Sequence, residues 1–250
     1  MDLAYQVQGE GKPILLIHSP GVDSREWKYV VPQLARSHKV ITFDGRGTGR
    51  SPAPHKPIHL VEDIRALLEH LEIKKATLVG HSMGGQGATE FALTYPSMVD
   101  RLVLIAPSLT GFPYSQAFVD WMNKVNSAAP DIEKLVQLSL EGPNYRMVMA
   151  GPHRDFFREM TIDYMTKVFT EWKNFEVIWP EPPAMERLEQ IQAKTLFVYG
   201  TVEWDDMTQV AKEFKRVPSV EFAKIEDADH MLTLTHAEEL ASRILRFQEN

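Results

Sequence analysis

The chain of 250 residues contains no cysteine. It therefore cannot form disulfides, use a thiolate nucleophile or bind a metal through cysteine. Its apolar runs all fall short of the ~20 residues that a membrane-spanning helix requires, and its first residues lack the basic and apolar regions of a signal peptide. We expect a cytoplasmic protein with no membrane partner.

Excess positive charge is also missing. The formal net charge is −7, without a basic stripe or a long acidic block, so nucleic acid is not an expected partner. The sequence shows no internal repeat and no low-complexity tract. With 44% hydrophobic and 24% charged residues, it fits one globular domain with a sizeable core. The sequence leaves the oligomeric state open.

The most informative stretch reads Gly-His-Ser-Met-Gly at residues 80–84. The short apolar run Ala76–Val79 before it predicts a buried strand, and the apolar spacing over Gly84–Tyr95 predicts a helix. A G-x-S-x-G pattern between a strand and a helix is typical of a nucleophile elbow, which presents the serine at a sharp turn. The alternative is a glycine-rich turn with an idle serine. The flanking elements favour Ser82 as a nucleophile.

The two glycines of this pattern have a steric reason. A strand that turns at once into a helix brings Gly80 and Gly84 close together, and side chains there would crowd the turn. We expect Ser82 itself to have a strained backbone.

A serine hydroxyl needs a neighbouring base to take its proton. His230 follows a predicted strand at Val220–Ile225 and precedes an amphipathic helix, so it lies on a loop from which it could reach Ser82. His81 adjoins the serine but is expected to point elsewhere. The remaining histidines outside the early loop are expected to be solvated: His38, His55, His59, His70, His153 and His236.

A carboxylate must orient such a histidine, and three follow the predicted strand Thr195–Tyr199. We favour Glu203, with Asp205 as the alternative acid; Asp206 is a weaker candidate, because both aspartates could instead cap the next helix. The chain order serine, acid, histidine is the order of an α/β-hydrolase triad.

An early loop offers a second oxyanion donor beside the Met83 N–H. The strand Pro13–Ile17 leads into His-Ser-Pro-Gly at residues 18–21, and the strand Lys39–Phe43 leads into the glycine-rich run 44–51. That run lacks the spacing of a phosphate-binding P-loop, so nucleotide binding is not expected.

Together these segments resemble the α/β-hydrolase superfamily, in its G-H-S-M-G-G serine hydrolase branch. Residues 80–85 carry that motif, and residues 44–51 fit the pattern D-x-R-G-x-G-x-S. Residues 18–27 are similar to enol-lactonases, whereas Pro20 and Gly21 together with 44–51 are similar to prolyl iminopeptidases. The resemblance covers about residues 4–107 and 190–250. It implies an α/β fold with a mostly parallel central sheet, helices on both faces, and a helical cap inserted after the strand that follows the elbow.

The early loop departs from the family pattern. The family usually has His-Gly-X, where X donates its N–H to the oxyanion, but the aligned residue here is Pro20, which has no N–H. We favour the Ser19 N–H as the donor, with the Gly21 N–H or the Ser19 hydroxyl as alternatives. Loss of one donor would cost on the order of 3 kcal/mol in the transition state.

The organisation is read as core, insertion, core. Residues 1–107 and 190–250 form the hydrolase core, and residues 108–189, rich in aromatics and methionine, form a cap of about four short helices. His18, Trp27 and Trp121 are candidate substrate contacts, although Trp27 fits a helix-anchoring core residue better than a pocket wall.

We expect a serine hydrolase that cleaves a small carboxylic ester or lactone without metal or organic cofactor. Alternatives on this fold are C–C bond hydrolysis, aminopeptidase action, perhydrolysis and cofactor-free oxygenation, or a ligand-binding protein without turnover. An aminopeptidase would need carboxylates in the cap to hold an α-ammonium group, and position alone suggests Glu171, Glu176 and Glu181.

Overall fold

Seven strands form one sheet in the computed structural model, which describes residues 1–249. The spatial order is β1-β3-β2-β4-β5-β6-β7, and every neighbouring pair is parallel except β1 with β3. The strands are β1 (Tyr5–Gln8), β2 (Lys12–Ile17), β3 (His38–Phe43), β4 (Ala76–His81), β5 (Val99–Ile105), β6 (Lys194–Gly200) and β7 (Val220–Ile225). The mostly parallel sheet expected from the sequence is confirmed.

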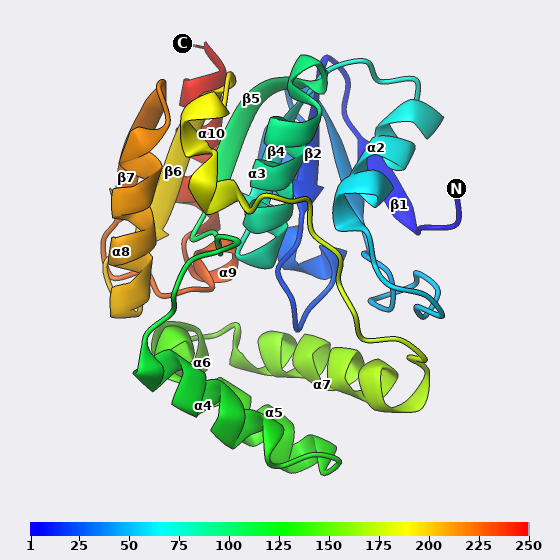
Figure 1. The fold of residues 1–250 in the computed structure, drawn as a ribbon, viewed down its shortest axis with the longest axis vertical. Coiled ribbons are helices and arrows are strands. Elements are labelled where there is room, and N and C mark those ends of the chain that lie inside the picture. The colour runs from blue at the N-terminus through cyan, green and yellow to red at the C-terminus, as the bar shows by residue number, and fades with distance from the viewer. Residues whose placement is uncertain (250) are drawn as a thin grey trace.

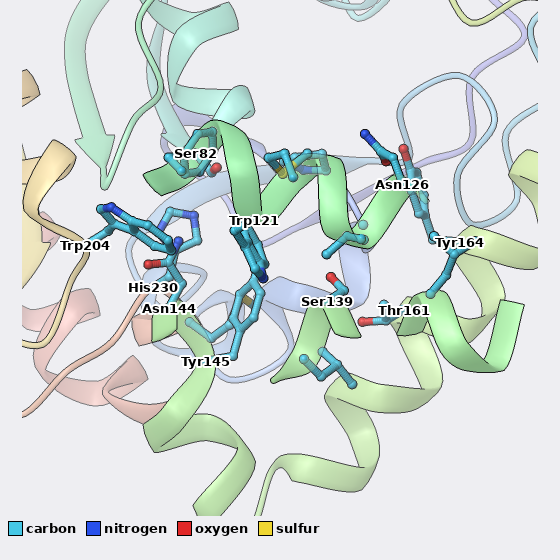
Figure 2. Close-up of a pocket in the computed structure, with 18 of the residues that line it drawn as sticks. Ser82, Trp121, Asn126, Ser139, Asn144, Tyr145, Thr161, Tyr164, Trp204 and His230 are labelled. Atoms are coloured by element: carbon cyan, nitrogen blue, oxygen red, sulfur yellow. The ribbon is translucent and has the colours of Figure 1, made fainter. Parts of the chain in front are cut away.

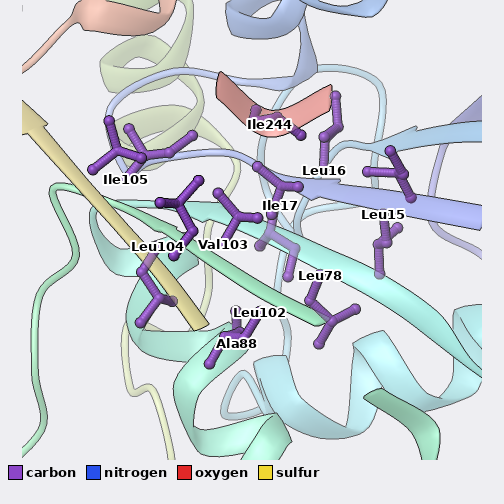
Figure 3. Packing of buried hydrophobic residues seen from close by; sticks show 14 of the residues in the cluster. Leu15, Leu16, Ile17, Leu78, Ala88, Leu102, Val103, Leu104, Ile105 and Ile244 are labelled. Carbon is purple, nitrogen blue, oxygen red and sulfur yellow. The ribbon is translucent and has the colours of Figure 1, made fainter. Parts of the chain in front are cut away.

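Helices cover both faces of this sheet. Figure 3 places Ala88 of α3 and Ile244 of α10 on opposite sides of strands that carry Leu16 and Val103. The helices of this part of the chain are α1 (Val31–Leu34), α2 (Leu60–His70), α3 (Met83–Thr94), α8 (Asp205–Glu213), α9 (Leu232–Thr235) and α10 (Ala237–Glu249). In residues 1–249 no helix combines the length and the apolar character needed to cross a bilayer.

The central strand β4 is buried along its whole length. All six residues of β4 are buried, because helices cover both faces of this parallel strand. A polar side chain on either face would lie in the core, so the strand is apolar without alternation. This burial explains why a continuous apolar run, without alternation, identified the strand. The carboxyl ends of β2, β4 and β6 meet at one edge of the sheet, where the loops of the candidate site lie.

The edge strand β1 was not predicted. It is short, its last three residues are exposed, and it pairs antiparallel with β3 through Tyr5–Phe43 and Gln8–Val40. A strand with one exposed edge and polar side chains carries no apolar signal.

Four α-helices occupy the segment between β5 and β6 and lie together beyond the carboxyl edge of the sheet (Figure 1). They are α4 (Gln116–Asn126), α5 (Ile132–Leu140), α6 (Arg146–Ala150) and α7 (Arg154–Thr170). Side chains of this layer form an apolar cluster of their own, which includes Val136, Val148 and Met160 and reaches the core through Val22 and Met231.

Candidate active site

Ser82 lies at the turn between β4 and α3. Its backbone has φ 54° and ψ −119°, a conformation that costs energy in a residue with a side chain. Two neighbours hold it there: the Ser82 N–H donates to Ile105 O at 2.9 Å, and Ser108 N–H donates to Ser82 O at 3.0 Å. The strained backbone turns the side chain away from the sheet and into a cavity that Ser82 helps to line.

The glycines beside Ser82 leave no room for a side chain. A Cβ at Gly80 would lie 2.3 Å from Gly84 O, and a Cβ at Gly84 would lie 2.3 Å from Ile17 O. Both contacts are with backbone atoms, which cannot move aside without opening the sheet. At Gly80 the crowding within the turn agrees with the reason inferred from the sequence, whereas at Gly84 the clash is with the end of the neighbouring strand β2.

His230 follows β7 on the loop expected from the sequence and faces the same cavity as Ser82 (Figure 2). It is buried, and its backbone N–H donates to Asn144 O at 3.0 Å. Its Nδ1 lies 3.2 Å from each carboxylate oxygen of Glu203. A carboxylate at Nδ1 leaves Nε2 free to exchange a proton with a substrate-side group.

The three candidate acids occupy different environments. Glu203 contacts His230, Asp205 is exposed at the start of α8, and Asp206 accepts hydrogen bonds from the N–H and hydroxyl of Ser115 at 2.9 and 2.6 Å. The structure therefore brings Glu203 to the histidine and engages Asp206 in holding the start of α4.

Electrostatics around His230 favour its protonated form. Burial alone lowers its pKa, but the charge of Glu203, the hydrogen bond to it and the charges of Asp229 and Glu26 together outweigh burial. The net result is a pKa above the ordinary histidine value. This environment stabilises an imidazolium, the form that a general base reaches after it takes a proton.

The early loop does not present Ser19 as a free donor. The Ser19 N–H donates to Glu26 Oε2 at 2.8 Å, so the favoured expectation for the second oxyanion donor competes with an existing hydrogen bond. Gly21, the alternative, has φ 82° and lines the cavity together with Pro20. The Met83 N–H belongs to the first turn of α3, where amides lack partners within the helix.

Two of the three candidate substrate contacts lie outside the cavity. His18 instead accepts from Gly45 N–H at 3.0 Å and contacts the Thr48 hydroxyl at 3.2 Å, so it joins the early loop to the run 44–51. Trp27 is fully buried in the core, which corrects its assignment as a pocket residue. Trp121 on α4 does line the cavity.

The cavity has a volume of about 490 Å³ and extends from Ser82 between α4, α5 and α7 (Figure 2). None of the described residues that line it is lysine or arginine, and its only carboxylates are Glu203 and Asp206. Its aromatic lining residues are Tyr114, Phe118, Trp121, Tyr145, Phe157, Tyr164, Phe169 and Trp204. Such a lining suits an uncharged, largely apolar group.

The acids suggested for an aminopeptidase lie elsewhere. Glu171, Glu176 and Glu181 are exposed, and none of them lines the cavity. Across the described part of the chain, no group of three or more histidine, aspartate or glutamate side chains is arranged to hold a metal ion.

Sequence reasoning missed Glu26. It is fully buried, although acids are rarely buried without a partner, and it accepts hydrogen bonds from Ser19 N–H and the Thr233 hydroxyl. Its one sequence signal is its position next to the apolar Trp27, in a segment otherwise read as a loop.

Comparison with known proteins identifies the family of the chain. A sequence model of the alpha/beta hydrolase family matches residues 14–243. An sn-1-specific diacylglycerol lipase of Danio rerio is 26% identical over 99% of this chain and 82% of its own length. An uncharacterized protein of Mycobacterium tuberculosis is 40% identical over 41% of this chain, and that match spans only 31% of the mycobacterial protein.

Solved structures share the fold over nearly the whole chain. A thermophilic esterase from Thermogutta terrifontis has a TM-score of 0.82 and 22% identity, over 99% of this chain and 93% of the esterase. The enol-lactonase from Burkholderia xenovorans LB400 has a TM-score of 0.78 and 20% identity, over 99% and 96%. At these identities the similarity establishes the fold alone.

Proposed function

Because the chain belongs to the alpha/beta hydrolase family, we propose that it cleaves a carboxylic ester or lactone through an acyl-enzyme on Ser82. One observation carries the proposal: behind an elbow serine, His230 Nδ1 lies 3.2 Å from both oxygens of Glu203, and the serine and the histidine line one cavity. This combination supplies a nucleophile, a base and an orienting acid.

In the proposed reaction, His230 Nε2 takes the proton of the Ser82 hydroxyl while its oxygen attacks the carbonyl carbon. Glu203 holds Nδ1–H and stabilises the imidazolium that forms. His230 then protonates the leaving alkoxide; the alcohol departs from an ester, whereas from a lactone it stays attached to the acyl chain. In the second half, His230 takes a proton from water and the hydroxide attacks the acyl carbon. The bond between the acyl carbon and Ser82 Oγ then breaks, Ser82 regains its proton from His230, and the carboxylic acid leaves.

Backbone N–H groups would stabilise the oxyanion of each tetrahedral intermediate. The Met83 N–H is one donor. We assign the second to Gly21, because Pro20 has no N–H and the Ser19 N–H already donates to Glu26. The positive φ of Gly21 turns the chain beside the cavity without a side chain in the way.

The lining of the cavity indicates the form of the substrate. An acyl group that enters between α4, α5 and α7 meets mainly aromatic and aliphatic side chains, the neutral polar groups of Asn126, Ser139 and Thr161, and no cation that would pair with a second carboxylate. We therefore propose a neutral ester or lactone with an apolar acyl group. The esterase, the enol-lactonase and the diacylglycerol lipase among the similar proteins support a carbonyl ester as the reacting bond.

The test is a panel of p-nitrophenyl esters of increasing acyl length, run beside neutral lactones and a matched ester with a terminal carboxylate on its acyl group. We expect turnover of neutral apolar esters or lactones and at least tenfold lower kcat/KM for the carboxylate ester. Absence of turnover on every ester and lactone, with the protein folded, would contradict the proposal.

A further inference from the structure

A second buried acid lies behind the proposed base. Glu26, in the short helical turn Ser24–Trp27, is fully buried, and its two carboxylate oxygens receive three donors. Oε2 accepts the Ser19 N–H at 2.8 Å; Oε1 accepts the Thr233 hydroxyl at 3.1 Å and a hydrogen bond from His81 Nδ1. Burial of a carboxylate is costly unless it is paired in this way.

Each donor belongs to a different part of the candidate site. Ser19 is in the early loop, next to Pro20 and Gly21. His81 is the last residue of β4 and directly precedes Ser82, and Thr233 is three residues beyond His230 in α9. One carboxylate therefore connects the early loop, the nucleophile elbow and the segment that follows His230.

His81 also contacts the base directly. The centroids of the His81 and His230 rings lie 4.8 Å apart, with the planes tilted by 45°. His81 Nε2 is buried and has no hydrogen-bond partner among the described residues, so Glu26 supplies the one hydrogen bond that orients this ring. Without Glu26, the His81 ring that packs against the His230 imidazole would lose its orientation.

The charge of Glu26 acts in the same direction. Burial raises the pKa of Glu26, but the charge and hydrogen bond of His81 and the hydrogen bond from the Ser19 N–H lower it by more. The net pKa is below the ordinary value, so Glu26 is ionised near neutral pH. The titratable groups around the His230 ring are Glu203, Asp229, Glu26, His81 and Tyr145. The Glu26 anion is one of the three that raise the pKa of His230.

We propose that Glu26 is a positioning residue for catalysis: it fixes the His81 ring behind His230 and holds the early loop against the nucleophile elbow. Glu26 does not line the cavity, so it acts on the reacting atoms through His81, Thr233 and Ser19. This proposal rests on the proposed function, because it assigns Glu26 a role toward Ser82 and His230.

Glu26→Gln is the primary test. The substitution keeps the size of the side chain, but the amide NH₂ group replaces one carboxylate oxygen and cannot accept a hydrogen bond. The donors to that oxygen therefore lose their acceptor. We expect kcat to fall roughly 10- to 100-fold, since small displacements of reacting groups have effects of this size. KM should change less than about twofold. The acid limb of the pH profile should move to lower pH, because loss of an anion lowers the pKa of His230.

Glu90→Gln is the matched control. Glu90 is another fully buried glutamate, which accepts from Ala184 N–H at 2.9 Å and pairs with Arg187 at 2.7 Å, and it does not line the cavity. Its amide variant should lower the melting temperature and leave the acid limb in place. If Glu26→Gln likewise lowers stability alone, with kcat and the acid limb unchanged, the positioning role is wrong.

Thr233→Val keeps the test sharp if Glu26→Gln does not fold. It removes one donor to Glu26 with little change in shape, and we expect a several-fold slower reaction of Ser82 with a fluorophosphonate. An unchanged rate would overturn the positioning role. Failure of the wild-type protein to react at Ser82 would instead overturn the proposed function, so the two failures are distinguishable.

Discussion

Among the acids after β6, contact separates Glu203 from its neighbours. It meets His230 Nδ1 with both oxygens, whereas Asp205 is exposed. We predict that Glu203→Gln lowers kcat by up to about 10⁴-fold, because a neutral amide no longer stabilises the imidazolium. Asp205→Asn, as the control, should stay within about twofold of wild type in the same steady-state assay. If Asp205→Asn lowers kcat strongly and Glu203→Gln lowers it only slightly, Asp205 and not Glu203 is the acid that orients His230.

In the proposed mechanism, the protonation of His230 sets the pH dependence of activity. A base must be neutral to accept the serine proton, and the surrounding carboxylates raise its pKa above the ordinary value. We therefore predict that kcat/KM rises with pH through an apparent pKa above about 6.5 and falls in acid. A profile measured from pH 5 to 9 on a protein shown to stay folded checks this. A flat profile would exclude His230 as the base.

At the scale of elements, the strand–serine–helix turn depends on bare backbone at Gly84. A Cβ there would lie 2.3 Å from Ile17 O, so we predict that Gly84→Ala destabilises the fold by about 3 kcal/mol or more in urea unfolding. Gly45→Ala is the control, since a Cβ at Gly45 has its nearest contact at 3.4 Å, with His18 Nε2. Equal stability of the two variants would show that the elbow tolerates a side chain.

The elements that the sequence predicted share a local cause. Buried parallel strands such as β4 are apolar along their length, and the elbow needs glycine at fixed positions, so both are visible in the order of residues. The edge strand β1 has no such signal, because it forms by backbone pairing with β3 and not through apolar side chains of its own.

The connections of the site could not be predicted in the same way. Glu26 meets Thr233 across 207 positions of the chain, and Asp229 accepts from Met147 and Val148 N–H at 2.7 and 2.9 Å. Such contacts exist only after the fold brings distant segments together. The loop order did predict the meeting of Glu203 and His230, because both follow parallel strands that end at one edge.

At the scale of the molecule, carboxylates join α4 and α6 to segments that follow β6 and β7. Asp229, beside the base, accepts two amides at the start of α6, and Asp206 accepts from Ser115 at the start of α4. These hydrogen bonds hold α4 and α6, and with them the cavity, in place over the carboxyl edge of the sheet. Its shape comes from packing among helices, which sequence periodicity does not specify.

Trp121 tests whether this cavity holds the acyl group. It lies on α4 beside Trp204, with ring centroids 5.9 Å apart, and both line the cavity. We predict that Trp121→Ala lowers kcat/KM about tenfold or more for a long-chain ester, equivalent to at least ~1.4 kcal/mol of lost contact, and little for an acetate. Phe175→Ala, at a side chain that is 62% exposed, should change neither. Equal losses on both esters would place the acyl chain elsewhere.

The most direct test of the mechanism is the covalent state of Ser82 during turnover. Acid quench of the enzyme in the first milliseconds with a p-nitrophenyl ester, followed by peptide mass spectrometry, should find the acyl group on Ser82. The p-nitrophenol burst should match the enzyme concentration. Ser82→Ala should keep its melting temperature and lose at least about 10³-fold in kcat. An acyl group on another residue, or turnover of Ser82→Ala within tenfold of wild type, would contradict a serine mechanism.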